Sequence, residues 1–125
     1  MQMEEQTPAD KLLITAYGDG GFRVLDERCK GSILVLPEEV VAWPVESLAQ
    51  LSVESLSALE ALKDQLDVLL IGAGAGHGVG SPAIAEALSE WGIAVDYMAT
   101  GAACRTFNVL QAEGRQVAAA LIAVE

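Results

Sequence analysis

Histidine and cysteine are scarce in this chain: His77 is the only histidine, and Cys29 and Cys104 are the only cysteines. A Cys/His zinc site needs several such ligands at short, regular spacings, so we expect no metal site. The two cysteines belong to no CxxC pair, and we interpret them as free thiols. A hydrolytic triad can draw only on His77 as its base, and no serine lies in a GxSxG turn. The sequence therefore predicts no catalytic residue.

Basic residues are also few. Seven Lys and Arg stand against 18 Asp and Glu, which gives a formal net charge of −11. A negative field of this size repels phosphate backbones and anionic lipids, so nucleic-acid binding is disfavoured. No apolar run approaches the roughly 18 residues needed to span a bilayer, and the acidic N-terminus resembles neither a signal peptide nor a transit peptide. We expect a cytoplasmic protein with no direct membrane insertion.

Aromatic residues make up only 5% of the chain, although hydrophobic residues reach 52%. The core must then be built mainly from Ala, Val, Leu and Ile. A chain of 125 residues buries about two-thirds of its unfolded surface, which is enough for one core without disulfides or metals. We expect a polar arm over residues 1–11 and a single domain over residues 12–125.

The amino-terminal third is typical of a β-meander. Two strand-like runs, LLITAY (12–17) and FRVL (22–25), flank a glycine-rich turn. The segment DERCKG (26–31) predicts a second turn, which leads to the runs SILVLP and VVAWP. Pro37 and Pro44 end these two runs, because proline cannot donate to a sheet ladder.

From Ser52 onward the pattern changes to alternating helices and strands. Ser52 is expected to cap a first helix, whose apolar positions recur at helical spacing: Leu56, Leu59, Leu62 and Leu66. Ser81 and Pro82 are expected to begin a second helix, and a third is capped by Thr100 and closed by Gly114. The runs DVLLIG, IAVDY and QVAAALIAV read as the strands between and after them. Strand–helix–strand units predict an α/β fold with a largely parallel, two-sided sheet.

The run VLLIGAGAGHGVG (68–80) suggests a nucleotide-binding loop at first sight. The dinucleotide fingerprint needs glycines at n, n+2 and n+5. In the registers that begin at Gly72, Gly74 and Gly76, the last position is taken instead by His77, Val79 and Ser81, respectively. A P-loop is excluded because no Gly-Lys pair exists. We therefore predict no cofactor. Two interpretations remain: an anion site built from backbone N–H groups and His77, or a tight structural turn with a solvated histidine.

Three residues of the last predicted helix allow both structural and functional interpretations. Cys104 lies near the helix start, where the helix dipole can lower a thiol pKa, but it also suits close packing as a small buried side chain. Arg105 and Asn108 lie three residues apart and share a face. An asparagine in mid-helix is mildly costly, so we expect Asn108 either to form a buried hydrogen bond to a loop or to belong to a contact surface.

The stretch MATGAACRTFNVLQAEGRQVAAALI (98–122) resembles the signature of a small domain family. That family contains the mitochondrial respiratory complex I assembly factor 3, together with uncharacterised bacterial and archaeal proteins. The positions that carry the resemblance are Thr100, Thr106, Phe107, Asn108, Glu113, Gly114 and Arg115. It extends from about Ile14 to Ile122. It implies a three-layer α/β fold with a central mixed sheet and, for the mitochondrial members, a non-enzymatic role in assembling a membrane-bound complex.

Two functional hypotheses follow. In the first, the chain is a non-catalytic interaction or assembly protein. Its partner would be another protein, such as a subunit of a membrane respiratory complex, bound by the glycine loop and the last helix. In the second, it is a small-molecule binding protein or an unrecognised enzyme that holds an anion at the loop Gly72–Gly80. The candidate binding residues are Gly72, Gly74, Gly76, His77, Ser81, Thr100, Arg105 and Asn108.

Overall fold

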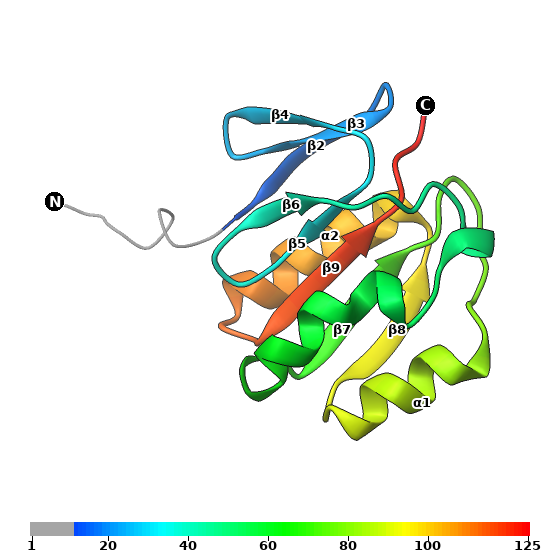
Figure 1. Cartoon of the computed structure of the whole chain (residues 1–125). Coiled ribbons are helices and arrows are strands. Elements are labelled where there is room, and N and C mark those ends of the chain that lie inside the picture. Colours follow the sequence, from blue (N-terminus) through cyan, green and yellow to red (C-terminus); the bar gives the residue numbers. More distant parts are fainter. Residues whose placement is uncertain (1–11) are drawn as a thin grey trace, which may run out of the picture.

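The computed structural model describes residues 12–125, so the predicted polar arm (1–11) lies outside the described residues. Figure 1 shows a small antiparallel sheet above a larger sheet and its helices. The small sheet is the predicted N-terminal meander. Its strands follow one another in chain order: β2 (Ile14–Gly18), β3 (Gly21–Val24) and β4 (Glu27–Lys30).

The expected turn across residues 26–31 was wrong, because most of this segment is β4. The chain reverses over Leu25 and Asp26 instead, and β4 then pairs with β3, with Cys29 opposite Phe22. β4 is an edge strand in which only Cys29 packs against the core. One apolar residue among Glu, Arg and Lys gives no alternating pattern, and for this reason the sequence did not reveal the strand.

The larger sheet has five strands and is mixed, as expected. In spatial order the strands are β6 (Val40–Ala42), β5 (Ile33–Val35), β9 (Val117–Leu121), β7 (Val68–Gly72) and β8 (Ala94–Met98). β9, β7 and β8 are parallel to one another, and β5 is antiparallel to both β9 and β6. The runs SILVLP and VVAWP thus form strands, but they belong to this sheet rather than to the meander, because β5 pairs with β9.

The first predicted helix is η3 (Glu54–Gln65), and it has 3₁₀ geometry. Leu56, Leu59 and Leu62 are spaced exactly three residues apart, so a helix of three residues per turn places them in one row. The first two are fully buried against the larger sheet. The helix begins two residues after Ser52, whose hydroxyl oxygen accepts a hydrogen bond from the Ser55 N–H at 3.1 Å. A short turn, η2 (Leu48–Gln50), precedes it.

The α-helices α1 (Pro82–Glu90) and α2 (Thr100–Ala112) begin and end close to the predicted residues. Each is followed by a glycine with positive φ, Gly92 (φ +76°) and Gly114 (φ +81°), as in the Schellman motif. Ser81 holds the N-cap position of α1. The expected cap of α2 was wrong: Ala99 is its N-cap, and Thr100 is the first helical residue.

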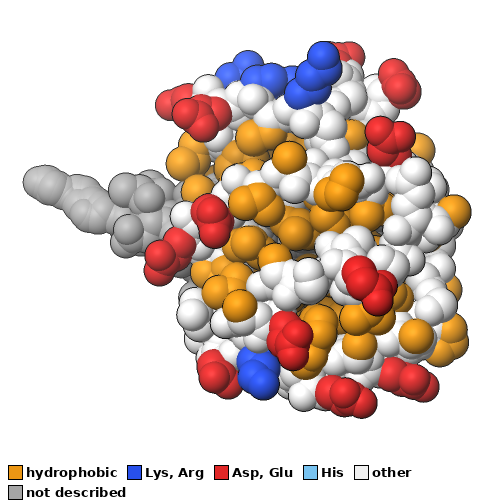
Figure 2. Space-filling model, viewed as in Figure 1, with side chains coloured by type: hydrophobic (Ala, Val, Ile, Leu, Met, Phe, Trp, Pro, Cys, Tyr) orange, Lys and Arg blue, Asp and Glu red, His pale blue; other side chains and the backbone are white. Residues whose placement is uncertain are grey.

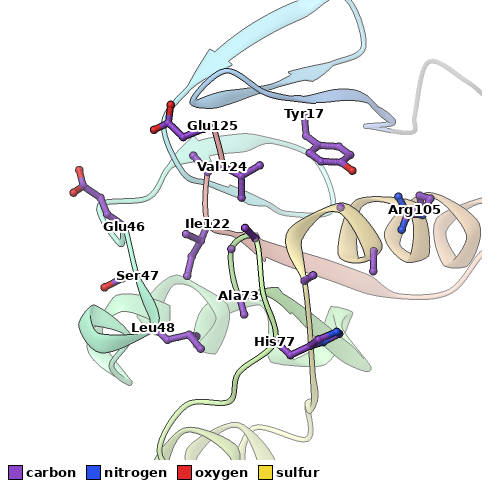
Figure 3. A pocket seen from close by; sticks show the side chains of 16 residues that line it. Tyr17, Glu46, Ser47, Leu48, Ala73, His77, Arg105, Ile122, Val124 and Glu125 are labelled. Carbon is purple, nitrogen blue, oxygen red and sulfur yellow. The ribbon is translucent and has the colours of Figure 1, made fainter.

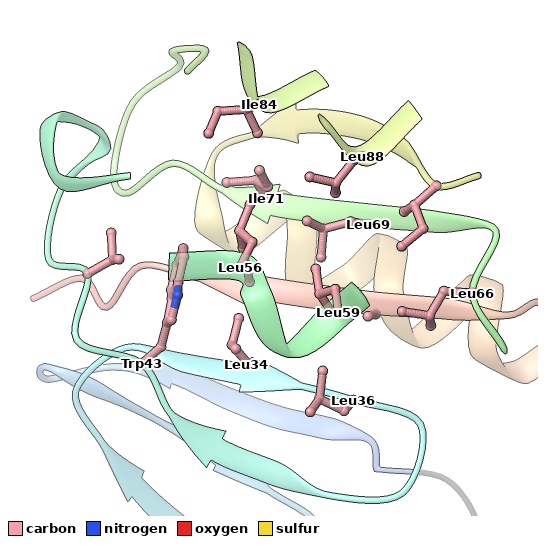
Figure 4. Close-up of a cluster of buried hydrophobic side chains, with 14 of the residues drawn as sticks. Leu34, Leu36, Trp43, Leu56, Leu59, Leu66, Leu69, Ile71, Ile84 and Leu88 are labelled. Carbon is pink, nitrogen blue, oxygen red and sulfur yellow. The ribbon is translucent and has the colours of Figure 1, made fainter. Parts of the chain in front are cut away.

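The larger sheet is buried on both faces, which gives the domain three layers. Along β9, side chains alternate between two clusters: Ala118 and Ala120 face η3 and α1, whereas Ala119 faces α2 and the meander. Figure 4 shows the first cluster, in which leucines of η3 and α1 meet those of β5 and β7. Small alanines in the central strand let both layers pack closely against it.

Candidate functional site

The parallel strands β7, β8 and β9 end at one edge of the sheet, and the segments that follow them surround a cleft. These segments are the glycine loop after β7, the start of α2 and residues 122–125. The cleft has a volume of about 850 Å³. Figure 3 shows that Leu48, Ala73 and Ile122 line its apolar part. This is the position at which open α/β sheets bind ligands.

Thr100 ties together the three segments at the base of this cleft. Its side chain is fully buried, and its hydroxyl donates a hydrogen bond to the Ile122 carbonyl oxygen at 2.7 Å. The Thr100 hydroxyl oxygen, Oγ1, also accepts a hydrogen bond from the Gly74 N–H at 2.9 Å. The Thr100 N–H in turn donates to the Gly74 carbonyl oxygen at 2.9 Å. Thr100 is therefore a structural residue of the site and lies beneath its surface.

Several glycines of the loop lie where a side chain would crowd a neighbouring residue. A Cβ on Gly72 would lie 3.0 Å from both Cα and Oγ1 of Thr100, so glycine lets α2 approach β7. A Cβ on Gly78 would lie 2.5 Å from Leu48, and one on Gly80 would lie 2.6 Å from the Tyr97 hydroxyl. These contacts favour the structural interpretation at Gly72, Gly78 and Gly80.

The polar side chains of the cleft come from separate parts of the chain. His77 extends from the glycine loop, and Arg105 lies on the second turn of α2. Tyr17 of β2 lies over the start of α2, where its hydroxyl occupies the space that a side chain at Gly101 would need. Glu46 lies on the far side of the cleft from Arg105 (Figure 3).

The α2 end of the cleft is locally electropositive. Arg105 is exposed and forms no ion pair with any residue in the described part of the chain. Within residues 12–125, the N–H groups of Gly101 and Ala102 also have no hydrogen-bond partner. N–H groups at a helix start carry the positive end of the helix dipole. An anionic group of a ligand or of a partner protein would find donors there.

Other predicted site residues lie outside the cleft. Gly76 faces open space, and Ser81 is exposed at the start of α1. Asn108 binds the backbone of β2: its amide nitrogen donates to the Ile14 carbonyl oxygen at 2.8 Å, and its Oδ1 accepts from the Ile14 N–H at 3.0 Å. Asn108 thus forms side-chain hydrogen bonds, but they are only partly buried and join it to a strand rather than to the expected loop, and the residue fixes the meander to α2.

Cys104 does not have the activated thiol that the helix dipole suggested. Its side chain is 3% exposed, and burial raises its pKa from 9.0 to about 11, an effect that the nearby Arg105 charge only partly offsets. A protonated thiol is a poor nucleophile at neutral pH. Cys104 is a packing residue between α2 and the meander.

Tyr17 and Leu48 of the cleft were not found from the sequence. Tyr17 becomes part of the site only because the meander lies across α2, and Leu48 only because η2 folds over the glycine loop. Both placements depend on tertiary packing and leave no local pattern. In residues 12–125 no group of His, Cys, Asp and Glu is arranged to hold a metal ion, and no helix there is long and apolar enough to cross a membrane.

Comparison with known proteins identifies the relatives of this chain. Residues 14–122 match a family of proteins of unknown function, DUF498/DUF598. The chain belongs to this family. Among the solved structures, a Bartonella henselae protein described as an outer membrane protein has a TM-score of 0.87 and 42% sequence identity, and the match covers 92% of this chain and 97% of that one. A Bordetella pertussis Mth938-like domain has a TM-score of 0.81 and 29% identity, over 98% and 92% of the two chains.

Members of the family from animals and bacteria have similar sequences. NADH dehydrogenase [ubiquinone] 1 alpha subcomplex assembly factor 3 of Drosophila melanogaster is 40% identical over 114 residues, which is 89% of this chain and 58% of the relative. The Danio rerio protein of the same name is 40% identical over 110 residues, 88% of this chain and 63% of the relative. This chain thus spans about three-fifths of their length. An uncharacterised Rhodobacter capsulatus protein is 35% identical, over 91% of this chain and 86% of its own.

Proposed function

We propose that this protein is a non-catalytic interaction protein that binds a partner protein at the cleft between the glycine loop, α2 and residues 122–125. The observation that carries the proposal is the 40% identity to an assembly factor for NADH dehydrogenase. By that relationship, the proposed partner is a subunit of a membrane respiratory complex.

The geometry of the cleft supports a protein ligand. The cleft is wide, and apolar side chains such as Leu48 and Ile122 line it beside the exposed Arg105. Arginine flanking an apolar surface is typical of the central part of a protein interface. The exposed face of α2 continues this surface as far as Val109, which is 55% exposed.

Site-specific photocrosslinking in the native cells tests the proposal. A photoreactive phenylalanine at Ala102, which lines the cleft, is compared with one at Ser57, which is exposed on η3. We expect crosslinks to respiratory NADH dehydrogenase subunits from position 102 and none from position 57, with the products identified by mass spectrometry. Arg105→Glu should abolish the crosslink and Arg115→Glu should not. No crosslink from position 102, or the same products from both positions, would contradict the proposal.

The arrangement of His77 and Arg105 favours a second candidate function, the binding of a small anion. Both residues line the cleft near the unpartnered N–H groups of Gly101 and Ala102 in the described chain. Phosphate, acetate and succinate are suitable probes, with thermal unfolding as the measurement. A ligand at a hundredfold excess over its dissociation constant raises stability by about 2.7 kcal/mol. An Arg105→Gln or His77→Ala variant that responds like the parent protein would exclude these residues from such a site.

A further inference from the structure

The outer face of the meander carries half of the basic residues of the described chain. Arg23 of β3 lies directly opposite Arg28 of β4, and Lys30 lies two residues further along β4 on the same side. All three are exposed, whereas Phe22 and Val24 of β3 point into the core. We call these three residues the basic face. Figure 2 shows Lys and Arg side chains gathered at the top of the molecule, over the meander.

The basic face contrasts with the rest of the molecule. Residues 31–125 contain three basic and twelve acidic residues, a formal net charge of −9, whereas residues 14–30 contain three of each. Of the meander carboxylates, Asp19 and Asp26 lie in the turns, and Glu27 is opposite Val24 on the other face. No carboxylate of residues 12–125 forms an ion pair with the basic face. Like charges directly opposite each other destabilise a sheet, so this arrangement has a cost within the chain itself.

Backbone carbonyl groups hold both guanidinium groups in place. Arg28 donates hydrogen bonds to the carbonyl oxygens of Gly18 at 3.1 Å and Asp19 at 2.8 Å, and its guanidinium lies over Gly21, where a Cβ would be 3.1 Å from it. Arg23 donates to the Asp26 carbonyl oxygen at 3.3 Å. A neutral acceptor fixes an arginine without cancelling its charge. The remaining donors stay available, and little side-chain entropy is lost when they bind an anion.

From the charges and the open edge of β4, we infer that the basic face binds an extended, carboxylate-rich segment of another protein. β4 is the last strand of its sheet, and within the described chain no strand lies beside its outer edge. A polypeptide can add to such an edge through main-chain hydrogen bonds, while alternate side chains contact one face of the sheet. Glutamates at every second position would then meet the basic face. This surface is distinct from the proposed cleft and does not depend on it.

The same features disfavour an anionic membrane as the ligand. Recognition of an anionic lipid surface typically uses about four to eight basic residues, and this face has three. A lipid headgroup also makes no use of an unpaired strand edge. Two carboxylates at alternate positions of an acidic strand, by contrast, match the spacing of Arg28 and Lys30, because alternate side chains on a strand lie about 6.6 Å apart. Arg23, opposite Arg28 on β3, adds a third positive charge behind them.

The test uses a fluorescent peptide of alternating glutamate and threonine, with a glutamine–threonine peptide as its control. We expect salt-sensitive binding of the acidic peptide only. The variant Arg23→Gln/Lys30→Gln should weaken binding by about tenfold or more, since it removes two of the three cations. The matched variant Lys63→Gln/Arg115→Gln removes two exposed cations outside the basic face and should change binding by less than about twofold.

Two further measurements keep the result decisive. NMR titration of the unmodified protein with the acidic peptide should shift the amide signals of Arg28 and Lys30. This measurement does not depend on whether the variants fold stably. Sedimentation with phosphatidylserine-containing vesicles distinguishes a membrane ligand. Equal weakening in the two double variants, amide shifts confined to the cleft, or binding to the vesicles but not to the peptide would each overturn the inference.

Discussion

Replacing Thr100 with valine is the sharpest test of how the cleft is built. Valine has nearly the same shape as threonine but lacks the hydroxyl group, so the Ile122 carbonyl oxygen and the Gly74 N–H both lose their partner. An acceptor left buried without a partner costs about 1–3 kcal/mol. The Gly74 N–H lies nearer the surface and can be hydrated, so its loss adds only about 1 kcal/mol. We expect the free energy of unfolding to fall by about 2–4 kcal/mol.

Thr100→Ser is the matched control, because it keeps the hydroxyl and removes one methyl group, at a cost of about 1 kcal/mol. Urea denaturation measures both variants, and an unchanged slope against denaturant shows that the same unfolding transition is compared. Amide hydrogen exchange at Gly74 should accelerate in the valine variant and not in the serine variant. If the valine variant is as stable as the serine variant, the hydroxyl does not hold these segments together and the description of the site is wrong.

Three further predictions concern packing, ionisation and the attachment of the meander. Gly72→Ala should lower stability by about 1–3 kcal/mol, because its Cβ would lie 3.0 Å from the Thr100 Cα and α2 would have to shift. Gly76→Ala should be neutral, because no atom lies within 4 Å of its Cβ, and urea denaturation measures both variants. Burial raises the pKa of Cys104 in the folded state from 9.0 to about 11. The contribution of the protonated thiol to the free energy of unfolding is therefore complete below pH 9 and is lost as the pH rises toward 11. Alkylation at pH 8 should therefore leave Cys104 unmodified, and rapid labelling there would refute its burial. Asn108→Ala should cost about 1–3 kcal/mol and speed hydrogen exchange at the Ile14 amide; unchanged exchange would show that the side chain does not hold β2.

Local signals in the sequence were sufficient for much of the fold. Ser81 with Pro82 marked the start of α1, and Gly92 and Gly114 marked the ends of α1 and α2, because these positions depend on backbone conformation within a few residues. The strands β7 and β9 were found because both are buried on two faces and are therefore continuously apolar.

What the sequence did not show depends on pairing and packing between distant residues. β4 has only Cys29 against the core, so its strand pattern is absent. The 3₁₀ geometry of η3 follows from leucines spaced by three, a spacing that an α-helical stripe also contains. Thr100 was predicted to cap the last helix. Its hydrogen bond to Ile122 was not predicted, because the two residues lie 22 positions apart in the sequence. His77 and Arg105 were predicted and both line one cleft, whereas Tyr17 lines it only through the docking of the meander.

The central position of β9 affects how the chain folds as it is synthesised. β5 with β6, and β7 with β8, are neighbouring pairs, but only β9 connects the two pairs, and it follows all of them in the chain. Until Val117–Leu121 emerges from the ribosome, the nascent chain therefore holds two separate pieces of sheet with open edges. Such edges are liable to pair with other chains. Closure by β9 then joins the two pieces of sheet in a single step, so the domain should fold cooperatively once β9 is available.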